Sequence, residues 1–306
     1  MQNNKRICEL LVETGAYTDL KDPVILTSGE LGIYYINTEK LVQDNGEFNN
    51  YGDRSDLMIN HAIKMIVEHP TFNEVIDILS EKTEELLSGK DKEERIISGG
   101  QRRDWLFSGP VARNLKLPHL SLYKNGKMEF LDKYGCIISG DIKDLPMGGF
   151  YDVHIVDLIT EGSSVYTKKE DKETGWVPMI REKGEIKDLV AVVTRLQGGE
   201  EMLAKQNVAV HSFVAIDEDF INKYSKEPER AIVYMRGPKE WSENYLKKEG
   251  ALALIKTFDP DGKKLDRAKK FINRYAGILK DNDRFIELDN AAKGRYNKYL
   301  SEIIGN

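Results

Sequence analysis

The chain has little of several things that define whole classes of protein. It contains two cysteines in 306 residues, Cys8 and Cys136. They lie far apart without CxxC spacing and suggest neither a disulfide framework nor a zinc site. No apolar run approaches the ~18 residues of a membrane span. The N-terminus, Met-Gln-Asn-Asn-Lys-Arg, lacks the apolar region of a secretory signal. These absences favour a protein of the reduced cytoplasm with no membrane partner.

Positive charge and metal-binding histidine patterns are also scarce. Lys and Arg number 45 against 51 Asp and Glu, which gives a formal net charge of −6. This balance predicts no nucleic-acid partner. The five histidines show no spacing typical of metal ligands. With 40% hydrophobic and 31% charged residues, the composition is that of an ordinary globular protein with one large domain or two modest ones.

The spacing of apolar residues predicts an α/β protein. Helical spacing covers residues 4–14, 57–68 and 72–87, and a hairpin is expected over 23–37. From Ile96 onward strands alternate with helices, including a helix at 105–115, one around Val165 and one at 179–183. The expected strands are 96–97, 119–123, 136–139, 153–157, 189–193 and 208–214. This alternation predicts a mainly parallel sheet flanked by helices, whereas residues 217–306 have mostly helical spacing.

The stretch from Val153 to Val165, V-H-I-V-D-L-I-T-E-G-S-S-V, holds the strongest functional signal. A buried strand reaches Asp157 and is followed by a small polar turn. The turn consists of Thr160, Glu161, Gly162, Ser163 and Ser164. A glycine-and-hydroxyl loop between a strand and a helix start offers backbone N–H groups to a phosphate. Since ligands of open α/β sheets bind at the carboxyl ends of strands, we expect a phosphorylated sugar here.

Four further segments place charged or aromatic side chains beside predicted strands. They are Ser98–Asp104 (S-G-G-Q-R-R-D), Leu122–Lys127 (L-Y-K-N-G-K), Leu26–Asn37 (L-T-S-G-E-L-G-I-Y-Y-I-N) and Thr194–Glu201 (T-R-L-Q-G-G-E-E). Two arginines at a helix start suit an anion. Three of these segments also have a plainer interpretation: a surface arginine pair with Asp104 as an N-cap, a charged hairpin turn, and hydrophobic packing of Tyr34 and Tyr35.

As an ordered set, these five segments resemble the type I phosphoribosyltransferases, and the orotate phosphoribosyltransferases in particular. The resemblance covers roughly residues 5–220. It implies a type I phosphoribosyltransferase fold, with a small N-terminal hood at 1–45, a core at 46–216 and a helical C-terminal extension at 217–306.

The resemblance also implies roles for individual residues around 5-phosphoribosyl-1-diphosphate (PRPP). Asp157 would hold the ribose and, weakly, Mg²⁺, which PRPP itself mainly carries; Val156 stands where the family has a first acid. The five turn residues would hold the 5-phosphate, Arg102 and Arg103 the pyrophosphate, and Lys124 and Lys127 would cover it as part of a mobile catalytic loop. The implied base-binding residues are Thr27, Tyr34, Tyr35, Thr160 and Arg195.

The implied reaction joins orotate to PRPP, giving orotidine 5-phosphate and pyrophosphate with Mg²⁺ as cofactor. A homodimer is implied as well, because the mobile loop of orotate enzymes closes the neighbour's site. Two alternatives stay open. One is transfer to another nucleobase, since Thr27 and Tyr123 replace cationic residues of the family. The other is a non-catalytic PRPP or nucleotide sensor, since Val156 and Glu161 depart from the PRPP motif.

Overall fold

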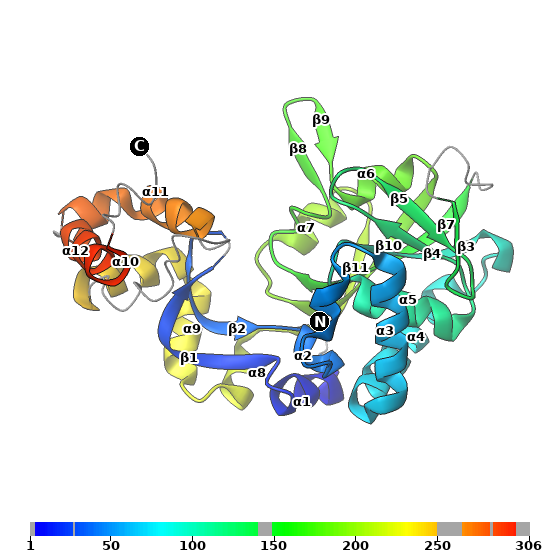
Figure 1. Ribbon diagram of the computed structural model, residues 1–306, viewed down its shortest axis with the longest axis horizontal. Coiled ribbons are helices and arrows are strands. Elements are labelled where there is room, and N and C mark those ends of the chain that lie inside the picture. The colour runs from blue at the N-terminus through cyan, green and yellow to red at the C-terminus, as the bar shows by residue number, and fades with distance from the viewer. Residues whose placement is uncertain (1–3, 27, 140–148, 250–264, 282–283, 298–306) are drawn as a thin grey trace. The chain divides into compact units, whose positions relative to one another are not determined.

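The structure, a computed structural model, describes residues 4–26, 28–139, 149–249, 265–281 and 284–297. Figure 1 shows the helices and strands with their labels. The chain divides into two compact units that interleave in sequence. The first unit comprises residues 1–16 and 37–217, and the second comprises 17–36 and 218–306. The three consecutive segments expected from the sequence, 1–45, 46–216 and 217–306, divide the chain differently, because the N-terminal hairpin clusters with the C-terminal helices.

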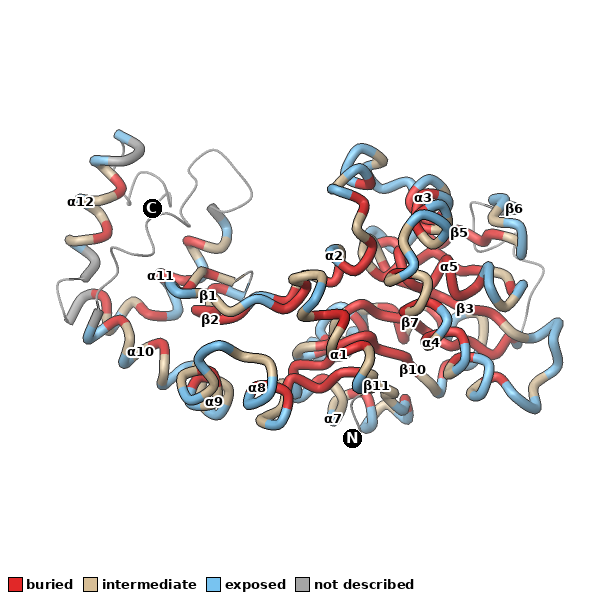
Figure 2. The backbone as a smooth tube through the Cα atoms, turned by 90° about the horizontal axis from the view of Figure 1, so that it is seen from below, coloured by how far each residue is buried: buried red, intermediate tan, exposed pale blue. Residues whose placement is uncertain are grey.

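The first unit is built on a seven-stranded sheet with the order β11-β10-β7-β3-β4-β5-β6. The strands are β3 (Arg95–Gly100), β4 (His119–Leu122), β5 (Met128–Leu131), β6 (Ile137–Ser139), β7 (Phe150–Ile159), β10 (Gly184–Thr194) and β11 (Ala209–Ala215). The five strands from β11 to β4 in this order pair parallel to their neighbours. Strand β5 pairs antiparallel with β4 on one side and with β6 on the other. Most of these strands are buried over most of their length, as Figure 2 shows.

Helices cover both faces of this sheet (Figure 1). Helices α3 (Ser55–Glu68), α4 (Pro70–Leu87) and α5 (Trp105–Leu115) pack together on one side. On the other side α6 (Trp176–Arg181) contributes to an apolar cluster with β3, β4, β7 and β10. The predicted α/β architecture, a mainly parallel sheet flanked by helices, is therefore confirmed. The unit also contains α1 (Lys5–Glu13), α2 (Glu39–Val42), α7 (Gly199–Ala204), the 3₁₀ turns η1 (Glu47–Tyr51) and η2 (Lys92–Glu94), and the hairpin of β8 (Thr167–Lys169) and β9 (Lys172–Thr174).

The second unit combines a hairpin with the C-terminal helices. Strands β1 (Tyr17–Ile25) and β2 (Leu31–Ile36) pair antiparallel, as the sequence predicts, although β1 begins earlier than expected. The helices are α8 (Glu218–Tyr224), α9 (Pro228–Arg236), α10 (Pro238–Glu249), α11 (Leu265–Asp281) and α12 (Arg284–Tyr296). Ile25 and Leu31 of the hairpin share an apolar cluster with Phe271 and Tyr275 of α11. The extension is therefore helical as predicted, and the hairpin forms part of its core.

The buried imidazole of His119 gives the first unit a testable pH dependence. His119 is hydrogen-bonded to the Ser108 hydroxyl through Nε2 (2.8 Å) and to the Ser121 hydroxyl through Nδ1 (3.1 Å). Burial lowers its pKa from 6.5 to about 3. Between these two values the unfolded chain binds more protons than the folded protein, so stability is lost as the pH falls.

We therefore expect acidification to weaken the fold through His119. Going from pH 7 to pH 5 should lower the free energy of unfolding by about 2 kcal/mol through this residue, at 1.36 kcal/mol for each unit below 6.5. His119→Gln keeps a hydrogen-bonding side chain but does not titrate, so its loss over the same interval should be smaller by that amount. Urea unfolding of both proteins at the two pH values measures the difference. An equal loss in both would contradict the assignment.

No described helix has both the length and the apolar composition that crossing a membrane requires.

Candidate functional site

The candidate site lies where the parallel strands of the first unit end. Strands β3, β4, β7 and β10 finish at Gly100, Leu122, Ile159 and Thr194, and their parallel pairing brings these ends to one edge. The loops that follow contain the segments selected from the sequence. A carboxyl edge of this kind is where open α/β sheets bind ligands. The fold therefore brings together residues that lie up to about a hundred positions apart in the chain.

Asp157 is the acid at the centre of this edge. Its side chain is buried, and its Oδ2 accepts a hydrogen bond from the Thr38 hydroxyl at 2.6 Å. The Nε atom of Arg103 lies 3.5 Å from the same oxygen. Val156, the neighbouring residue, is buried in the apolar cluster beneath α6, because successive side chains of a strand point to opposite faces. Val156 is thus part of the core.

Asp104 joins two loops of the site. Its Oδ1 accepts the backbone N–H of Asp157 (3.0 Å), and its Oδ2 accepts the backbone N–H of Gly100 (3.2 Å). Burial, followed by the nearby charge of Asp157, raises the pKa of Asp104 well above its usual range. Asp104 stands at the N-cap position of α5, as the plainer interpretation expects, but its side chain makes no capping hydrogen bond to that helix. It links the loop after β3 to the end of β7 instead.

The two arginines after β3 have different surroundings. Arg103 lies between two carboxylates, with its Nε 3.5 Å from Asp157 and 3.8 Å from Glu39 Oε1. Burial raises the pKa of Glu39, and the charge of Arg103 opposes that rise. Arg102 donates from Nη2 to the Phe48 carbonyl (3.5 Å) and to Asn49 Oδ1 (3.4 Å). The peptide bond from Gln101 to Arg102 is cis. Arg103 thus lies beside Asp157, whereas the hydrogen bonds of Arg102 run to residues of η1.

The turn from Thr160 to Ser164 has the properties of an anion cradle. Among the described residues, no acceptor takes a hydrogen bond from the backbone N–H groups of Glu161, Gly162, Ser163 or Ser164. Gly162 is buried, whereas Glu161, Ser163 and Ser164 are exposed. Amides without protein partners beside exposed hydroxyls can bind a phosphate. The turn therefore keeps the donor groups that the sequence interpretation requires.

The helix expected around Val165 is absent from the structure. The N–H groups of Val165 and Tyr166 both donate to the Gly162 carbonyl, which makes one turn. The chain then enters the β8–β9 hairpin, whose two-residue bend contains Glu170 at φ +53°. The prediction was wrong because the apolar face of this segment is only one helical turn long. The run that follows, Thr-Lys-Lys-Glu-Asp-Lys-Glu-Thr, has no apolar face that a helix could bury.

Gly162 gives the second testable prediction. Its φ is +72°, and a Cβ there would lie 2.7 Å from Met202 Cε and 3.3 Å from Gly199 Cα. Gly162→Ala should therefore distort the turn and weaken phosphate binding, with a conformational cost of about 1 kcal/mol. Calorimetry with PRPP should show about tenfold weaker binding, the effect of roughly one lost hydrogen bond to a charged group.

Gly89→Ala is the matched control for this change. Gly89 has a φ of +82°, and nothing lies within 4 Å of an added Cβ. It carries the same backbone strain without the steric conflict, so it should lose stability but keep PRPP affinity. Equal affinity in the two variants would contradict a phosphate site at the turn.

Lys124 and Lys127 lie in a short turn between the antiparallel strands β4 and β5. The Lys124 N–H donates to Gln101 Oε1 (2.9 Å), which ties this turn to the loop that holds the two arginines. The Lys127 ammonium lies 2.6 Å from Glu129 Oε1. Glu129 also accepts a hydrogen bond from the Tyr123 hydroxyl. The structure thus places both lysines in a hairpin turn, the alternative interpretation of this segment, and joins the Lys124 end of that turn to the loop of the two arginines.

The predicted base-binding residues fall into both units. Arg195 follows β10, is buried, and donates its backbone N–H to the Ile159 carbonyl (2.9 Å), which places it beside Thr160. Tyr34 belongs to the second unit, where its ring packs against Tyr17 and Tyr234. Tyr35, also in that unit, is 44% exposed. Thr27 lies outside the described residues.

Thr38, Glu39 and Asp104 are site residues that the sequence interpretation missed. Thr38 and Glu39 directly follow the Leu26–Asn37 segment, and Asp104 ends the arginine segment. Their position next to or at the end of a selected segment is only a weak indication that they belong to the site, and the sequence shows no spacing pattern that adds to it. Within the described residues, no group of three or more His, Cys, Asp or Glu side chains is arranged to hold a metal ion.

Several solved structures are similar to this chain. Orotate phosphoribosyltransferase from Aeropyrum pernix is 18% identical with a TM-score of 0.45, over 71% of this chain and 98% of that one. UMP synthase from Leishmania donovani is 14% identical with a TM-score of 0.45, over 74% of this chain and 41% of that one. Adenine phosphoribosyltransferase from Thermoanaerobacter pseudethanolicus is 15% identical with a TM-score of 0.35, over 60% and 89%. No protein-family model and no curated protein matches the sequence.

Proposed function

We propose that this protein is a type I phosphoribosyltransferase that transfers ribose 5-phosphate from PRPP to a nucleobase. One observation carries the proposal. Arg103, selected as a pyrophosphate ligand, lies 3.5 Å from Asp157, selected as the ribose acid, although 54 positions separate them. The backbone N–H groups of the turn at 161–164, which have no hydrogen-bond acceptor among the residues that the structure describes, follow the strand that carries Asp157. The donors and the acid needed for the two ends of PRPP therefore meet at one edge.

The proposed mechanism follows from the charges at this edge. The amides and hydroxyls of the 160–164 turn bind the 5-phosphate, and Asp157 accepts hydrogen bonds from the ribose hydroxyls. The bond from C1 to the diphosphate breaks, and its electron pair leaves with pyrophosphate. A ring nitrogen of the base forms the new bond to C1, and the proton of that nitrogen passes to the departing pyrophosphate. Arg103 stabilises the charge on pyrophosphate, and the carboxylate of Asp157 stabilises the positive charge that develops on the sugar.

Magnesium fits the donor groups present. Asp157 and Glu39 supply carboxylate oxygens and Thr38 a hydroxyl, all within the surroundings of Arg103. Mg²⁺ prefers oxygen ligands and is usually held by one or two carboxylates together with substrate phosphates. Bound with PRPP, the ion would neutralise charge on the leaving pyrophosphate. Asp157 would be the main protein contact, with PRPP carrying most of the coordination.

Orotate is the base we propose first. Arg195 follows β10, next to the end of β7, and a guanidinium can hold a carboxylate through two parallel N–H donors. Thr160 lies on the adjacent loop and offers a hydroxyl to the ring. The proposal includes Thr27, Tyr34 and Tyr35 as further base contacts. It also includes Lys124 and Lys127 as residues that close over the bound pyrophosphate. We propose that the protein acts as a homodimer in the cytoplasm.

The decisive experiment measures pyrophosphate release from PRPP and Mg²⁺ with orotate, uracil, adenine and hypoxanthine in parallel. We expect turnover with orotate that exceeds the other three bases. Turnover confined to another base would reject orotate while keeping the transferase. Lys127→Ala tests the cover in the same assay, and the ion pair with Glu129 must break for Lys127 to act.

A non-catalytic PRPP sensor is the second candidate. It is favoured by Val156, which is buried in the core where the family has an acid, and by the engagement of Lys127 with Glu129. Calorimetry that shows PRPP binding, together with no pyrophosphate release for any of the four bases, would establish the sensor in place of the transferase.

A further inference from the structure

The second unit contains a pocket that the proposed reaction does not use. It has a volume of about 500 Å³ and lies along α9 and α10. That volume is within the range of small-molecule sites, roughly 300–1,000 Å³. The residues that line it are Val233, Arg236, Gly237, Glu240, Trp241, Asn244, Tyr245 and Lys248. All of them belong to the second unit, so the pocket is independent of the carboxyl edge of the sheet.

The middle of the pocket is a fixed aromatic surface. The rings of Trp241 and Tyr245 stack with centroids 5.2 Å apart and planes 15° apart. Tyr234 packs edge-on against Trp241 at 5.6 Å, and the Arg230 guanidinium lies 5.6 Å from the same ring. These contacts hold the indole in place before any ligand arrives. A flat aromatic surface of this kind suits a planar heteroaromatic ring.

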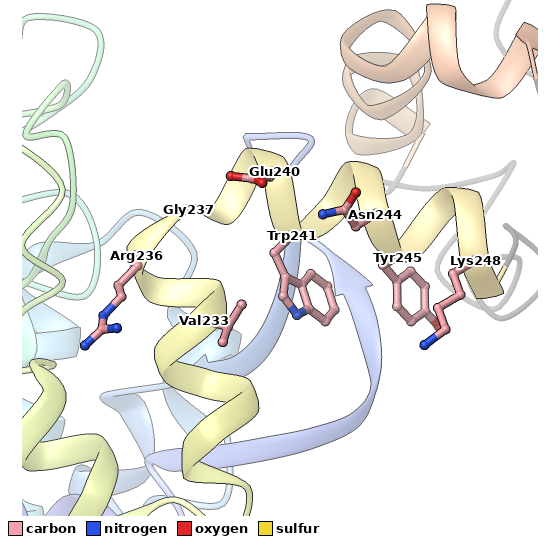
Figure 3. A pocket seen from close by; sticks show the side chains of 8 residues that line it. All are labelled: Val233, Arg236, Gly237, Glu240, Trp241, Asn244, Tyr245 and Lys248. Carbon is pink, nitrogen blue, oxygen red and sulfur yellow. The ribbon is translucent and has the colours of Figure 1, made fainter.

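The wall of the pocket that α10 forms has an acidic residue at one end and a basic residue at the other. Glu240, Asn244 and Lys248 follow one another at four-residue spacing on α10, which places Glu240 and Lys248 about 12 Å apart. The carboxylate of Glu240 lies 3.8 Å from the position of a Cβ on Gly237, at the corner between the helices. Arg236 is already paired with Glu218 through two hydrogen bonds of 2.7 and 2.8 Å. Lys248 is therefore the cation of this wall, at the end away from Glu240, as Figure 3 shows.

We propose that this pocket binds a nucleoside monophosphate. Its base would pack against the Trp241–Tyr245 pair, with its polar edge toward the Asn244 amide, which both donates and accepts hydrogen bonds. The phosphate would lie at the Lys248 end, because the Glu240 carboxylate repels an anion from the other. The exposed apolar side chain of Val233 (60% exposed) would be covered by the ligand.

Adenosine monophosphate is the probe for this site, with adenosine and inorganic phosphate as partial ligands. We expect the nucleotide to change the emission of Trp241, one of three tryptophans in the chain, and Trp241→Phe to remove that change. Trp105 and Trp176 are buried in the first unit and serve as the unchanged background. Adenosine should bind more weakly than the nucleotide, and inorganic phosphate alone should leave the emission unchanged.

Three variants test the assignment by calorimetry. Lys248→Ala should weaken binding of the nucleotide by roughly threefold to fivefold, the effect of one exposed charge pair. Tyr245→Leu keeps an apolar side chain but loses the flat ring, and should weaken binding by about tenfold or more. Lys247→Ala, the same change one residue away and outside the pocket lining, should bind as the wild type does. No emission change with the nucleotide, or equal binding by Lys248→Ala and Lys247→Ala, would overturn the proposal. Neither readout requires PRPP turnover, so the result is independent of the proposed function.

Discussion

Replacing Asp157 with asparagine should lower kcat/KM for PRPP by about 10²–10³-fold, the usual effect of removing one group that stabilises charge in a transition state. The substitution keeps the shape of the side chain and leaves an amide oxygen to accept the Thr38 hydroxyl, which now donates at 2.6 Å. The fold at the end of β7 should therefore survive. What is lost is the negative charge next to the sugar and opposite Arg103.

Asp188→Asn is the matched control for this change. Asp188 is a carboxylate on β10, on the same sheet, and it accepts hydrogen bonds from the Tyr151 hydroxyl and the His211 ring, both at 2.7 Å. It lies far from the carboxyl end of its strand, so its variant should retain activity within about twofold, as surface changes away from a site usually do. Initial rates of pyrophosphate release with saturating base measure both. An Asp157→Asn protein as active as Asp188→Asn would mean that the sugar binds elsewhere.

The fold was predictable because its signals are periodic and long. The alternation of buried strands and amphipathic helices after Ile96 is a local property of the sequence. It predicted α5, β4 and β11 close to their observed bounds, and it located β3, β7 and β10, which extend beyond the predicted runs. The turn at 163–165 shows the limit. A single helical turn can begin a longer helix or lead into a hairpin. Here a hairpin follows, because the next residues are exposed and charged and have no apolar face to bury.

Site residues could be selected from the sequence only where they belong to a motif. Asp157 lies near the end of β7 and Arg103 follows the neighbouring strand β3, so the sheet brings the two side chains within 3.5 Å. Their roles toward a ligand stay predictions. Thr38 could not be assigned to the site, since its bond to Asp157 spans 119 positions and depends on where α2 lies in the first unit. The hairpin that carries Tyr34 illustrates the same point. Its apolar face packs with helices more than 200 residues away, a pairing that no local pattern encodes.

Asp104 is a positioning residue on this geometry, and its removal should have the second large effect. Its carboxylate accepts the N–H of Gly100, at the end of β3, and the N–H of Asp157, near the end of β7, and the loops that follow these strands would hold opposite ends of PRPP. Asp104→Asn replaces one acceptor oxygen with an NH₂ group that faces an N–H donor. One of the two loops must then move, and a buried backbone donor loses its partner, at a cost of about 1–3 kcal/mol.

The effect should fall on PRPP more than on its parts. In the proposed complex, pyrophosphate would contact only the loop after β3, and ribose 5-phosphate only the end of β7 and the turn after it. Each should therefore bind the Asp104→Asn protein within about threefold of wild type. PRPP engages both loops at once and gains affinity from their fixed separation, so its binding should weaken by about 10–10²-fold. Calorimetry with the three ligands separates this coupling from a general loss of structure.

Asp132→Asn provides the comparison for a structural effect. Asp132 accepts the N–H groups of Tyr134 (2.8 Å) and Cys136 (2.9 Å) in the turn between β5 and β6. Its variant should lose some stability and bind all three ligands as wild type does. If Asp104→Asn weakens pyrophosphate, ribose 5-phosphate and PRPP by the same factor, Asp104 supports the fold and does not set the distance between the loops. A selective loss of PRPP affinity follows only if the Asp104 carboxylate fixes the distance between the two loops.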